Sequence, residues 1–317
     1  MDNKDKKILG TLITDARQSI TRIAKKAGVS REVALYRMNN LNKGIIRGYY
    51  TTINLSALGF RRYGCLMQFS GITIEEEERL IRDIAAFPFI SFVGPQIGKW
   101  NVAFDIHAQS DTHLKEILDG IKTRIGMHLT NFLITNPGAN YQYFPHKYLG
   151  EKEPKKPVQK EESYRPDKID KKILSLLAKD SRIGYVALAQ HTKLSANAIK
   201  YRIRNLEKTG IISGYTISLD FTQLGFQFYN IQLELDTTPN KKFLAYLAAH
   251  PRIMYYYHYL GQENWDMDIG VIVKDVRELR NVLVGIRKDF GDTVKIYNIM
   301  MNPDIIKDDI APEGVFQ

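Results

Sequence analysis

Cysteine and long apolar runs are scarce in this chain. The 317 residues include one cysteine, Cys65, which excludes an intrachain disulfide and a cysteine-based zinc site and fits a reducing compartment. Cys65 lies in an apolar, strand-like run, where we expect a buried and inert thiol. No apolar stretch approaches membrane-spanning length, and the charged start from Met1 to Lys4 does not resemble a signal peptide. We therefore expect a cytoplasmic protein with no membrane partner.

Patterns typical of catalysis or metal binding are also missing. The seven histidines are scattered, none stands at metal-ligand spacing, and there is no Gly-rich phosphate loop. The acidic run from Glu75 to Glu78 is explained by a helix start, where the macrodipole favours carboxylates. We therefore expect no metal, no cofactor and no catalytic residue. The net charge of +10, from 45 basic and 35 acidic residues, instead favours a polyanionic partner.

The chain repeats itself at an offset of about half its length. Residues 5–9 read Asp-Lys-Lys-Ile-Leu and return unchanged at 170–174, an offset of 165. The pattern Gly-Ile-Ile-x-Gly-Tyr occurs at 44–49 and again at 210–215, an offset of 166. Matching order over this distance indicates duplication and fusion of one unit. A fused pair of this kind is a built-in dimer.

Each copy opens with a pattern typical of a winged helix-turn-helix. The elements predicted for copy one are a helix over 4–14, a short helix capped by Ser19, a tight turn at Gly28, a third helix over 31–43 capped by Ser30, and a strand pair or wing over 45–54. On the third helix, Val33 or Ala34, Met38 and Leu41 would face inward. Copy two repeats this order, with Ser195 capping a helix over 196–208 and Lys193 in place of the turn glycine.

A longer mixed segment follows each helical head. Copy one predicts strands over 63–69, 89–93, 100–108 and 129–135, with helices over 74–86 and 112–125. Copy two predicts strands over 228–235, 253–259, 265–273 and 294–300, with helices over 241–249 and 276–288. The order βαββαβ is typical of a ferredoxin-like layer of helices on an antiparallel sheet. Because the strands are apolar on both sides, two copies could bury their open sheet faces against each other.

The fold class that follows is α+β, with two winged helix-turn-helix heads and two ferredoxin-like domains arranged as an intramolecular pseudo-dimer. Residues 150–166 are rich in Pro, Lys and Glu and predict a solvated linker. The expected domains are head 1 over 1–54, ferredoxin-like domain 1 over 55–149, the linker over 150–166, head 2 over 167–220 and ferredoxin-like domain 2 over 221–317.

The head motifs resemble those of the Lrp/AsnC (feast/famine) regulators. The string Ser30-x6-Arg37-Met38-x2-Leu41-x2-Gly44-Ile45-Ile46 and its counterpart Ser195-x6-Arg202-Ile203-x2-Leu206-x3-Gly210-Ile211-Ile212 carry the resemblance. Asp-x-Arg at 15–17 and 180–182 and Leu-Gly-Phe at 58–60 and 224–226 also match it. The resemblance implies a DNA-binding head, a β-hinge and an effector-sensing domain (RAM domain) that dimerises through its sheets. A family member normally carries one such unit, whereas this chain carries two.

The third helix of each head is the predicted DNA-contacting element, because its cations and amides suit phosphate positioning and base-edge hydrogen bonds. The helix has a net charge of +2 over 30–43 and +3 over 195–208. The predicted DNA contacts are Arg31, Tyr36, Arg37, Asn39, Asn40 and Lys43 in copy one, and Asn197, Lys200, Tyr201, Arg202, Arg204 and Lys208 in copy two. Arg37 and Arg202 have a structural alternative, in which they tie the helix to its own head.

The resemblance also places an effector site at a Gly-x-x-Asp motif before the third strand of each sensing domain. The candidate effector-binding residues are Gly98, Trp100 and Asn101 in copy one and Gly261, Trp265 and Asp266 in copy two. An acid can bind the ammonium group of an amino-acid-like effector, which an amide does less strongly. The alternative is a pair of hairpin-like turns, each followed by a buried Trp.

The tyrosine-rich run 255–259 could line a pocket, although alternating strand packing at a dimer sheet explains it more simply.

We therefore interpret the chain as a sequence-specific regulator of transcription that binds double-stranded DNA as an internal pseudo-dimer, and not as an enzyme. A small-molecule effector and further assembly into a higher homo-oligomer are compatible with this interpretation. The rival is an enzyme resembling the siroheme decarboxylases, which are similar to Lrp/AsnC proteins and act on a tetrapyrrole. His107, His250 and His258 are the nearby side chains that such a reaction could use.

Overall fold

The computed structural model describes residues 1–135, 142–143, 164–259 and 265–317. The elements of copy one are α1 (Asn3–Thr14), α2 (Ile20–Ala27), α3 (Arg31–Leu41), β1 (Ile46–Ile53), β2 (Arg61–Phe69), α4 (Ile74–Ala85), β3 (Ile90–Pro95), β4 (Val102–Ala108), α5 (Asp111–Ile125), β5 (Leu129–Thr135) and β6 (Gln142–Tyr143). Those of copy two are α6 (Lys168–Lys179), α7 (Tyr185–Thr192), α8 (Ala196–Lys208), β7 (Ile212–Leu219), β8 (Gln227–Leu235), α9 (Lys241–Ala249), β9 (Ile253–His258), β10 (Met267–Val273), α10 (Val276–Phe290), β11 (Val294–Asn302) and β12 (Lys307–Asp308). The predicted α+β order is confirmed in both copies.

The chain divides into two compact units, and each unit combines equivalent parts of both copies. One compact unit combines the described residues of Met1–Phe60, Leu149–Leu224 and Asp309–Gln317, and so contains both helical heads. The second combines those of Arg61–Tyr148 and Gly225–Asp308, and so contains both sensing domains. The linker predicted over 150–166 lies outside the described residues up to position 163. None of the described helices has the length and apolar character needed to cross a membrane.

The predicted helix caps and turns of the heads are present in the structure. Ser19 and Ser30 accept backbone N–H bonds at the starts of α2 and α3 through their hydroxyls, which satisfies donors that a helix start leaves unpaired. Gly28 ends α2 in the left-handed conformation with φ of +67°. Lys193 takes the same conformation in copy two with φ of +59°, although it carries a side chain. On α3, Ala34 is buried and Val33 is exposed, which settles the alternative left open by the sequence.

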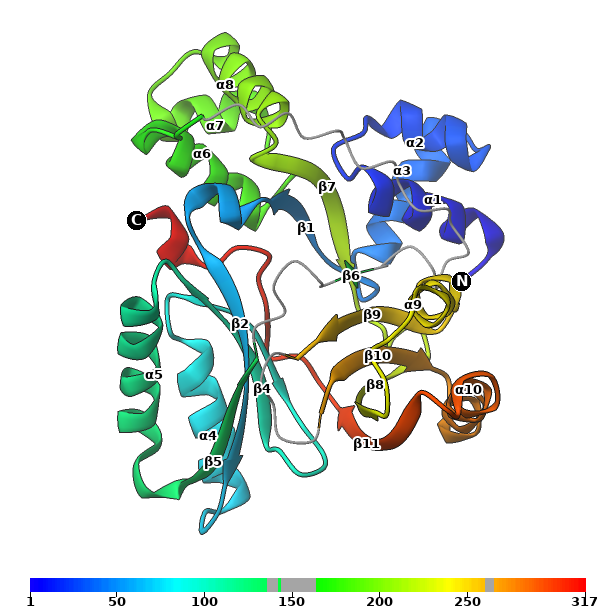
Figure 1. Cartoon of the computed structure of the whole chain (residues 1–317). Coiled ribbons are helices and arrows are strands. Elements are labelled where there is room, and N and C mark those ends of the chain that lie inside the picture. The colour runs from blue at the N-terminus through cyan, green and yellow to red at the C-terminus, as the bar shows by residue number, and fades with distance from the viewer. Residues whose placement is uncertain (136–141, 144–163, 260–264) are drawn as a thin grey trace. The chain divides into compact units, whose positions relative to one another are not determined.

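The strand that follows each head pairs with its counterpart from the other copy. β1 and β7 form a two-stranded antiparallel sheet, in which Tyr50 lies opposite Thr216. The sheet runs between the two groups of helices (Figure 1), and the buried Thr51 donates from Oγ1 to the carbonyl oxygen of Leu177 in α6 at 2.7 Å. The expected wing is therefore not a hairpin within one head: each head contributes one strand to a sheet shared by both.

The two sensing sheets also exchange strands. The strand order is β12-β3-β4-β2-β5 in one sheet and β11-β8-β10-β9-β6 in the other. β12 comes from the end of copy two and pairs with β3 of copy one, whereas β6 comes from the end of copy one and pairs with β9 of copy two. Each sheet is thus completed by the other copy.

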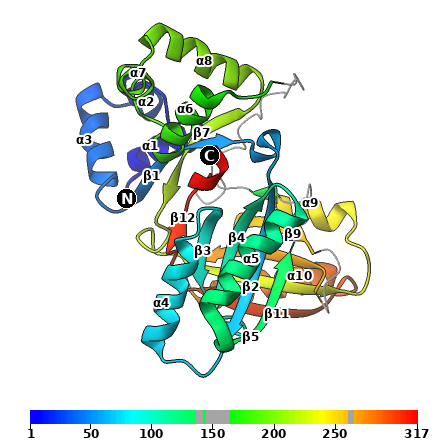
Figure 2. The same ribbon diagram turned by 90° about the vertical axis from the view of Figure 1, so that its left-hand side faces the viewer.

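Each sensing sheet has a helix-covered face and an open face. In copy one, α4 and α5 lie against the sheet (Figure 2) and bury a core that includes Met67, Phe104 and Ile121. The open faces of the two copies meet each other: Leu66 and Trp100 of copy one pack with Met300 of copy two, and Ile97 pairs through its backbone with Met301. The expectation that two copies bury their sheet faces together is therefore confirmed.

The exchanged strands predict that the two copies stay together after the chain is cut. We expect a protein with a protease site engineered within Lys155–Lys160 to elute after cleavage at the position of the intact chain, because each half completes a sheet of the other and covers its apolar face. Residues 1–150 or 167–317 expressed alone should aggregate or self-associate. Size-exclusion chromatography measures both outcomes, and two well-behaved separate monomers would contradict the pseudo-dimer.

Candidate nucleic-acid interface

Each third helix is held in its head by three apolar side chains. Ala34, Met38 and Leu41 are buried in α3, and Ile199, Ile203 and Leu206 are buried in α8. This spacing of three to four residues occupies one helix face and leaves the opposite face to solvent. Ser30 and Ser195 cap the two helices, each hydroxyl accepting a backbone N–H at 3.2 Å.

The solvent faces of α3 and α8 carry most of the predicted DNA contacts. The exposed members are Arg31, Tyr36, Asn39, Asn40 and Lys43 in copy one, and Asn197, Lys200, Tyr201, Arg204 and Lys208 in copy two. Tyr36 and Tyr201, which are equivalent by the offset of 165, are 68% and 74% exposed. Both rings are therefore accessible to a partner.

The two faces differ chemically. α3 begins at the cation Arg31 and presents amides and the exposed apolar Leu35, with Lys43 just beyond its end. α8 instead presents Lys200 and Arg204 in the middle of the helix. Amides pair with adenine edges, apolar groups contact thymine methyls, and cations contact guanine or phosphate. The two helices therefore present different chemical groups to solvent.

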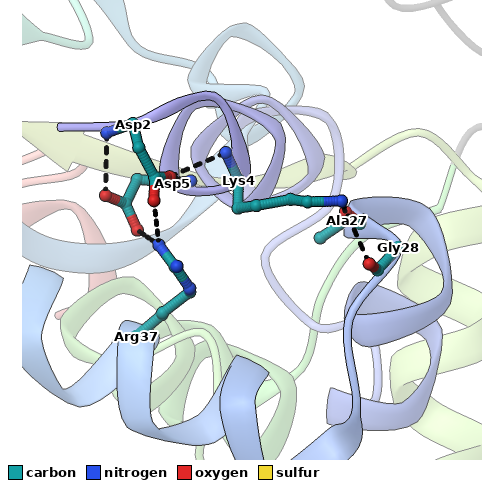
Figure 3. Close-up of polar contacts among 6 residues, drawn as sticks. All are labelled: Asp2, Lys4, Asp5, Ala27, Gly28 and Arg37. Atoms are coloured by element: carbon teal, nitrogen blue, oxygen red, sulfur yellow. Dashed lines mark hydrogen bonds and ion pairs between the residues drawn. The ribbon is translucent and has the colours of Figure 1, made fainter.

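Arg37 and Arg202 point back into their own heads. Arg37 Nη1 lies 2.7 Å from Asp2 Oδ2 and 2.8 Å from Asp5 Oδ1 (Figure 3). Arg202 repeats the arrangement with Asp167 and Asp170, both at 2.8 Å. The carboxylates raise the pKa of both guanidinium groups, chiefly through the hydrogen bonds that the arginines donate to Asp5 and Asp170. These contacts favour the structural alternative, in which the two arginines tie the third helix to the first.

The heads are braced differently at the turn before the third helix. In copy one, Lys4 Nζ donates to the carbonyl oxygens of Ala27 and Gly28 at 3.2 and 3.1 Å (Figure 3). A cation here satisfies the carbonyls that the end of α2 leaves unpaired. The equivalent of Lys4 in copy two is Ile169, so copy two lacks this brace.

Two of the predicted effector residues, Asn101 and Asp266, accept hydrogen bonds from the backbone of their own sensing domain. Asn101 Oδ1 accepts the N–H of Phe69 at 2.8 Å, and Asn101 Nδ2 donates to Glu77 Oε2 at 2.8 Å. In copy two, Asp266 Oδ2 accepts the N–H of Leu235 at 2.7 Å. Phe69 and Leu235 are equivalent by the offset of 166, so both side chains hold the end of the first sheet strand in their copy. These bonds favour the hairpin-turn alternative.

The other candidate effector residues lie in different surroundings. Gly98 has φ of +146°, a conformation that requires glycine. Trp100 is 4% exposed and packs between the two sheets with Leu66 and Met300. Trp265 is half-buried, and Gly261 lies outside the described residues.

The tyrosine run of copy two alternates across the sheet, as simple strand packing predicts. Tyr256 joins the helix-covered core. Tyr255 and Tyr259 instead donate their hydroxyls to Asp268, each at 3.1 Å, on the face turned toward the other sheet. Asn230 Nδ2 donates to the same carboxyl group at 3.1 Å.

Asp268 is a buried acid at a position where the other copy has an apolar residue. The side chain is 1% exposed, and burial raises its pKa to about 7. Asp268 lies opposite Gln232 in the sheet, and the equivalent pair in copy one is Ala103 opposite Leu66. The duplicated sheets have therefore kept their backbone pairing while their facing side chains have diverged.

Two further expectations concern groups that could act chemically. Cys65 is buried, and burial raises the pKa of its thiol, as an inert thiol requires. Among the described residues, no three His, Cys, Asp or Glu side chains are arranged to hold a metal ion.

Sequence similarity identifies the family. Residues 1–42 match the AsnC-type helix-turn-helix domain, and residues 166–213 match a winged helix-turn-helix DNA-binding domain. The HTH-type transcriptional regulator FL11 of Pyrococcus horikoshii is 30% identical over 118 residues, which cover 37% of this chain and 77% of FL11. The chain belongs to the Lrp/AsnC family.

Further comparisons show the tandem arrangement. An uncharacterised HTH-type transcriptional regulator of Pyrococcus abyssi is 26% identical, with 98% of its length matched to 46% of this chain. A whole family member thus corresponds to about half of this Lrp/AsnC protein. The crystal structure of the siroheme decarboxylase NirDL covers 97% of this chain and 93% of NirDL, with a TM-score of 0.65 and 14% identity. NirDL therefore shares the fold along the whole chain.

The raised pKa of Asp268 predicts a pH dependence of stability. A carboxyl that titrates near 7 when folded, against 3.8 when unfolded, stabilises the fold below about pH 4 and loses that contribution as the pH rises through 7. From pH 5 to pH 8, the free energy of unfolding of the wild type should fall by about 2–3 kcal/mol relative to Asp268→Asn.

Urea denaturation of both proteins at several pH values measures this difference. His107, whose pKa burial lowers to about 3, is present in both proteins and cancels in the comparison. Parallel pH profiles of the two proteins would show that Asp268 is ionised throughout.

Proposed function

We propose that this protein is a transcriptional regulator that binds double-stranded DNA sequence-specifically through α3 and α8, acting as an intramolecular pseudo-dimer in the cytoplasm. The observation that carries the proposal is the pair of exposed third-helix faces, which present cations, amides and tyrosines to solvent. The net charge of +10 supports a polyanionic partner, and the relatives of the chain are named as HTH-type transcriptional regulators.

Selection of bound sequences from random duplex DNA tests this proposal. A homodimer selects a palindrome because its two recognition helices are identical. Here Leu35 and Asn39 on α3 correspond to Lys200 and Arg204 on α8, so we expect two unlike half-sites about 10 base pairs apart or a multiple of this. Strict palindromes would mean that one head is idle or that like heads of two chains act together. Absence of any enriched sequence would refute sequence-specific binding.

The two half-sites should depend differently on salt. Replacing Lys200 and Arg204 with Ala removes two cations from α8, so fewer counterions are released on binding and the slope of log affinity against log salt should become less steep by about 2. The matched control is Arg280→Ala with Lys288→Ala, which removes the same charge from the exposed side of α10. Salt titrations of binding compare the variants, and equal slopes would exclude the assigned contacts.

A small-molecule effector is a separate part of the proposal. An amino-acid-like ligand at the predicted motif would have to displace the hydrogen bonds that the N–H groups of Phe69 and Leu235 donate to Asn101 and Asp266. The two heads would have more than one arrangement, and these would differ in affinity for the operator. An effector would act by binding one arrangement more tightly and so raising its population. The test is the DNA affinity measured with and without an amino-acid-like ligand. A ligand that leaves this affinity unchanged is not an effector.

A second candidate function is an activity on a tetrapyrrole like that of siroheme decarboxylases, and the full-length fold similarity to NirDL favours it. The three nearby histidines give it little support. His107 is buried with its Nε2 2.8 Å from Ser91 Oγ, His250 Nδ1 accepts the N–H of Arg252, and burial lowers the pKa of His258. A tetrapyrrole absorption band on mixing with siroheme, without retention of duplex DNA, would favour the enzyme.

A further inference from the structure

The Asp-x-Arg motifs of the two copies reach across to each other. Arg17 Nη1 donates to the carbonyl oxygens of Ser181 at 2.6 Å and Ile183 at 3.4 Å, both in copy two. Arg182 Nη1 donates to Ala16 and Gln18 of copy one at 2.5 and 3.3 Å. Each guanidinium thus binds the turn that carries the other.

The acid of each motif shapes the turn that presents the arginine. Asp15 Oδ1 accepts the N–H of Arg17 at 3.0 Å, and Asp180 Oδ1 accepts that of Arg182 at 2.8 Å. Asx turns of this kind fix the local backbone. The motif therefore supplies both a shaped turn and a side chain that leaves it.

Tyrosines of the shared sheet connect these arginines to the third helices. Arg182 lies over the ring of Tyr49 with its Cζ 5.4 Å from the ring centroid, and the Tyr49 hydroxyl donates to Asn42, the C-cap of α3, at 2.8 Å. Arg17 lies 5.3 Å over the ring of Tyr215, whose hydroxyl donates to Glu207 of α8 at 2.6 Å. Each third helix is therefore linked through one tyrosine to the arginine of the other head.

Backbone bonds join the same elements. The N–H of Ala16 donates to Tyr215 O at 3.0 Å, and the N–H of Ser181 donates to Tyr49 O at 2.8 Å. Each turn is therefore held to the shared sheet at the tyrosine on which its own arginine stacks. A planar guanidinium can stack on a ring and donate several hydrogen bonds at once, whereas a lysine ammonium offers a compact point charge.

We propose that Arg17 and Arg182 are positioning residues that set the separation and orientation of α3 and α8, and thereby the half-site spacing that the protein accepts on DNA. The DNA part rests on the proposed function. The separation of the helices is a property of the protein alone and can be measured without DNA.

The test is the double variant Arg17→Lys with Arg182→Lys, which keeps the net charge and so the general attraction to DNA. The matched control is Arg280→Lys with Arg287→Lys, which changes two exposed arginines of α10, outside the heads. In each protein, Tyr36→Cys and Tyr201→Cys are added and the two cysteines carry spin labels. Double electron–electron resonance then measures the distance between α3 and α8. Cys65 is buried and needs no replacement. Circular dichroism confirms folding of each protein.

We expect one narrow distance distribution in the wild type and the control, and a broader one in the Arg17/Arg182 variant. On the selected operator, two inserted base pairs should weaken wild-type and control binding by about tenfold or more, a penalty similar to a base mismatch, and the variant by about threefold or less. Loss of stability alone would lower binding to all spacings equally.

An unchanged distance distribution in the variant would overturn the inference, whatever happens on DNA. A broader distribution with an unchanged spacing preference would overturn its DNA part. The distribution could also broaden while the wild type, the control and the variant all fail to bind duplex DNA. In that case Arg17 and Arg182 position the heads, but the proposed function is wrong.

Discussion

The pairing of β1 with β7 is the constraint on which the arrangement of the heads depends. An isolated strand leaves a row of backbone N–H and C=O groups without partners, which is costly when the strand is also packed on a helix. Each head contributes one strand in the described part of the chain, and that strand pairs with its counterpart from the other copy. Once the strands are paired, Tyr49 and Tyr215 lie where the arginines of the opposite heads can stack on them. The sensing sheets follow the same logic, since β6 and β12 complete the sheet of the opposite copy.

Fusion has let the two copies become unlike at equivalent places. In a homodimer every substitution appears on both sides of the symmetry axis, so a buried acid in the sheet interface is introduced twice. Here Asp268 occurs in one sheet, where two tyrosine hydroxyls and an amide surround it, and the other sheet has Ala103. The heads have diverged in the same way, because Lys4 braces a turn in copy one and Ile169 stands at that position in copy two. The two copies thus share one backbone fold but differ in their side chains at equivalent positions.

Local features of the fold could be predicted well from the sequence because their causes are local. Ser19 and Ser30 cap helices through bonds to residues three positions away, and the apolar spacing of Ile199, Ile203 and Leu206 marks the buried face of α8. The left-handed turn at Lys193 was also expected from its alignment with Gly28. These inferences need only neighbouring residues and the repeat.

Long-range contacts could not be predicted in this way. β6 and β12 have two residues each, too few to show a pattern, and their partners lie in the other copy. The Asp-x-Arg motif was visible, but nothing near it in the sequence shows that Arg17 binds carbonyls 164 and 166 residues away. Arg37 carried two interpretations because an arginine on a helix surface suits both DNA and a carboxylate, and Asp2 and Asp5 become its neighbours only after folding. Asn101 also carried two interpretations for this reason, since its backbone partner Phe69 lies on another strand.

The position of β12 bears on how the chain folds during its synthesis. β3 in copy one acquires this edge strand from residues 307–308, so the first sheet leaves the ribosome long before its last strand exists. At typical translation rates of about 5–20 residues per second, the interval between the end of β5 and the synthesis of β12 is about 10–35 s. During that time the edge of β3 and the face around Leu66 and Trp100 are open to any other nascent chain. In a tandem chain the correct partner is synthesised on the same ribosome. Because copy two follows copy one, the sheet of copy one can be completed only after copy two has been synthesised.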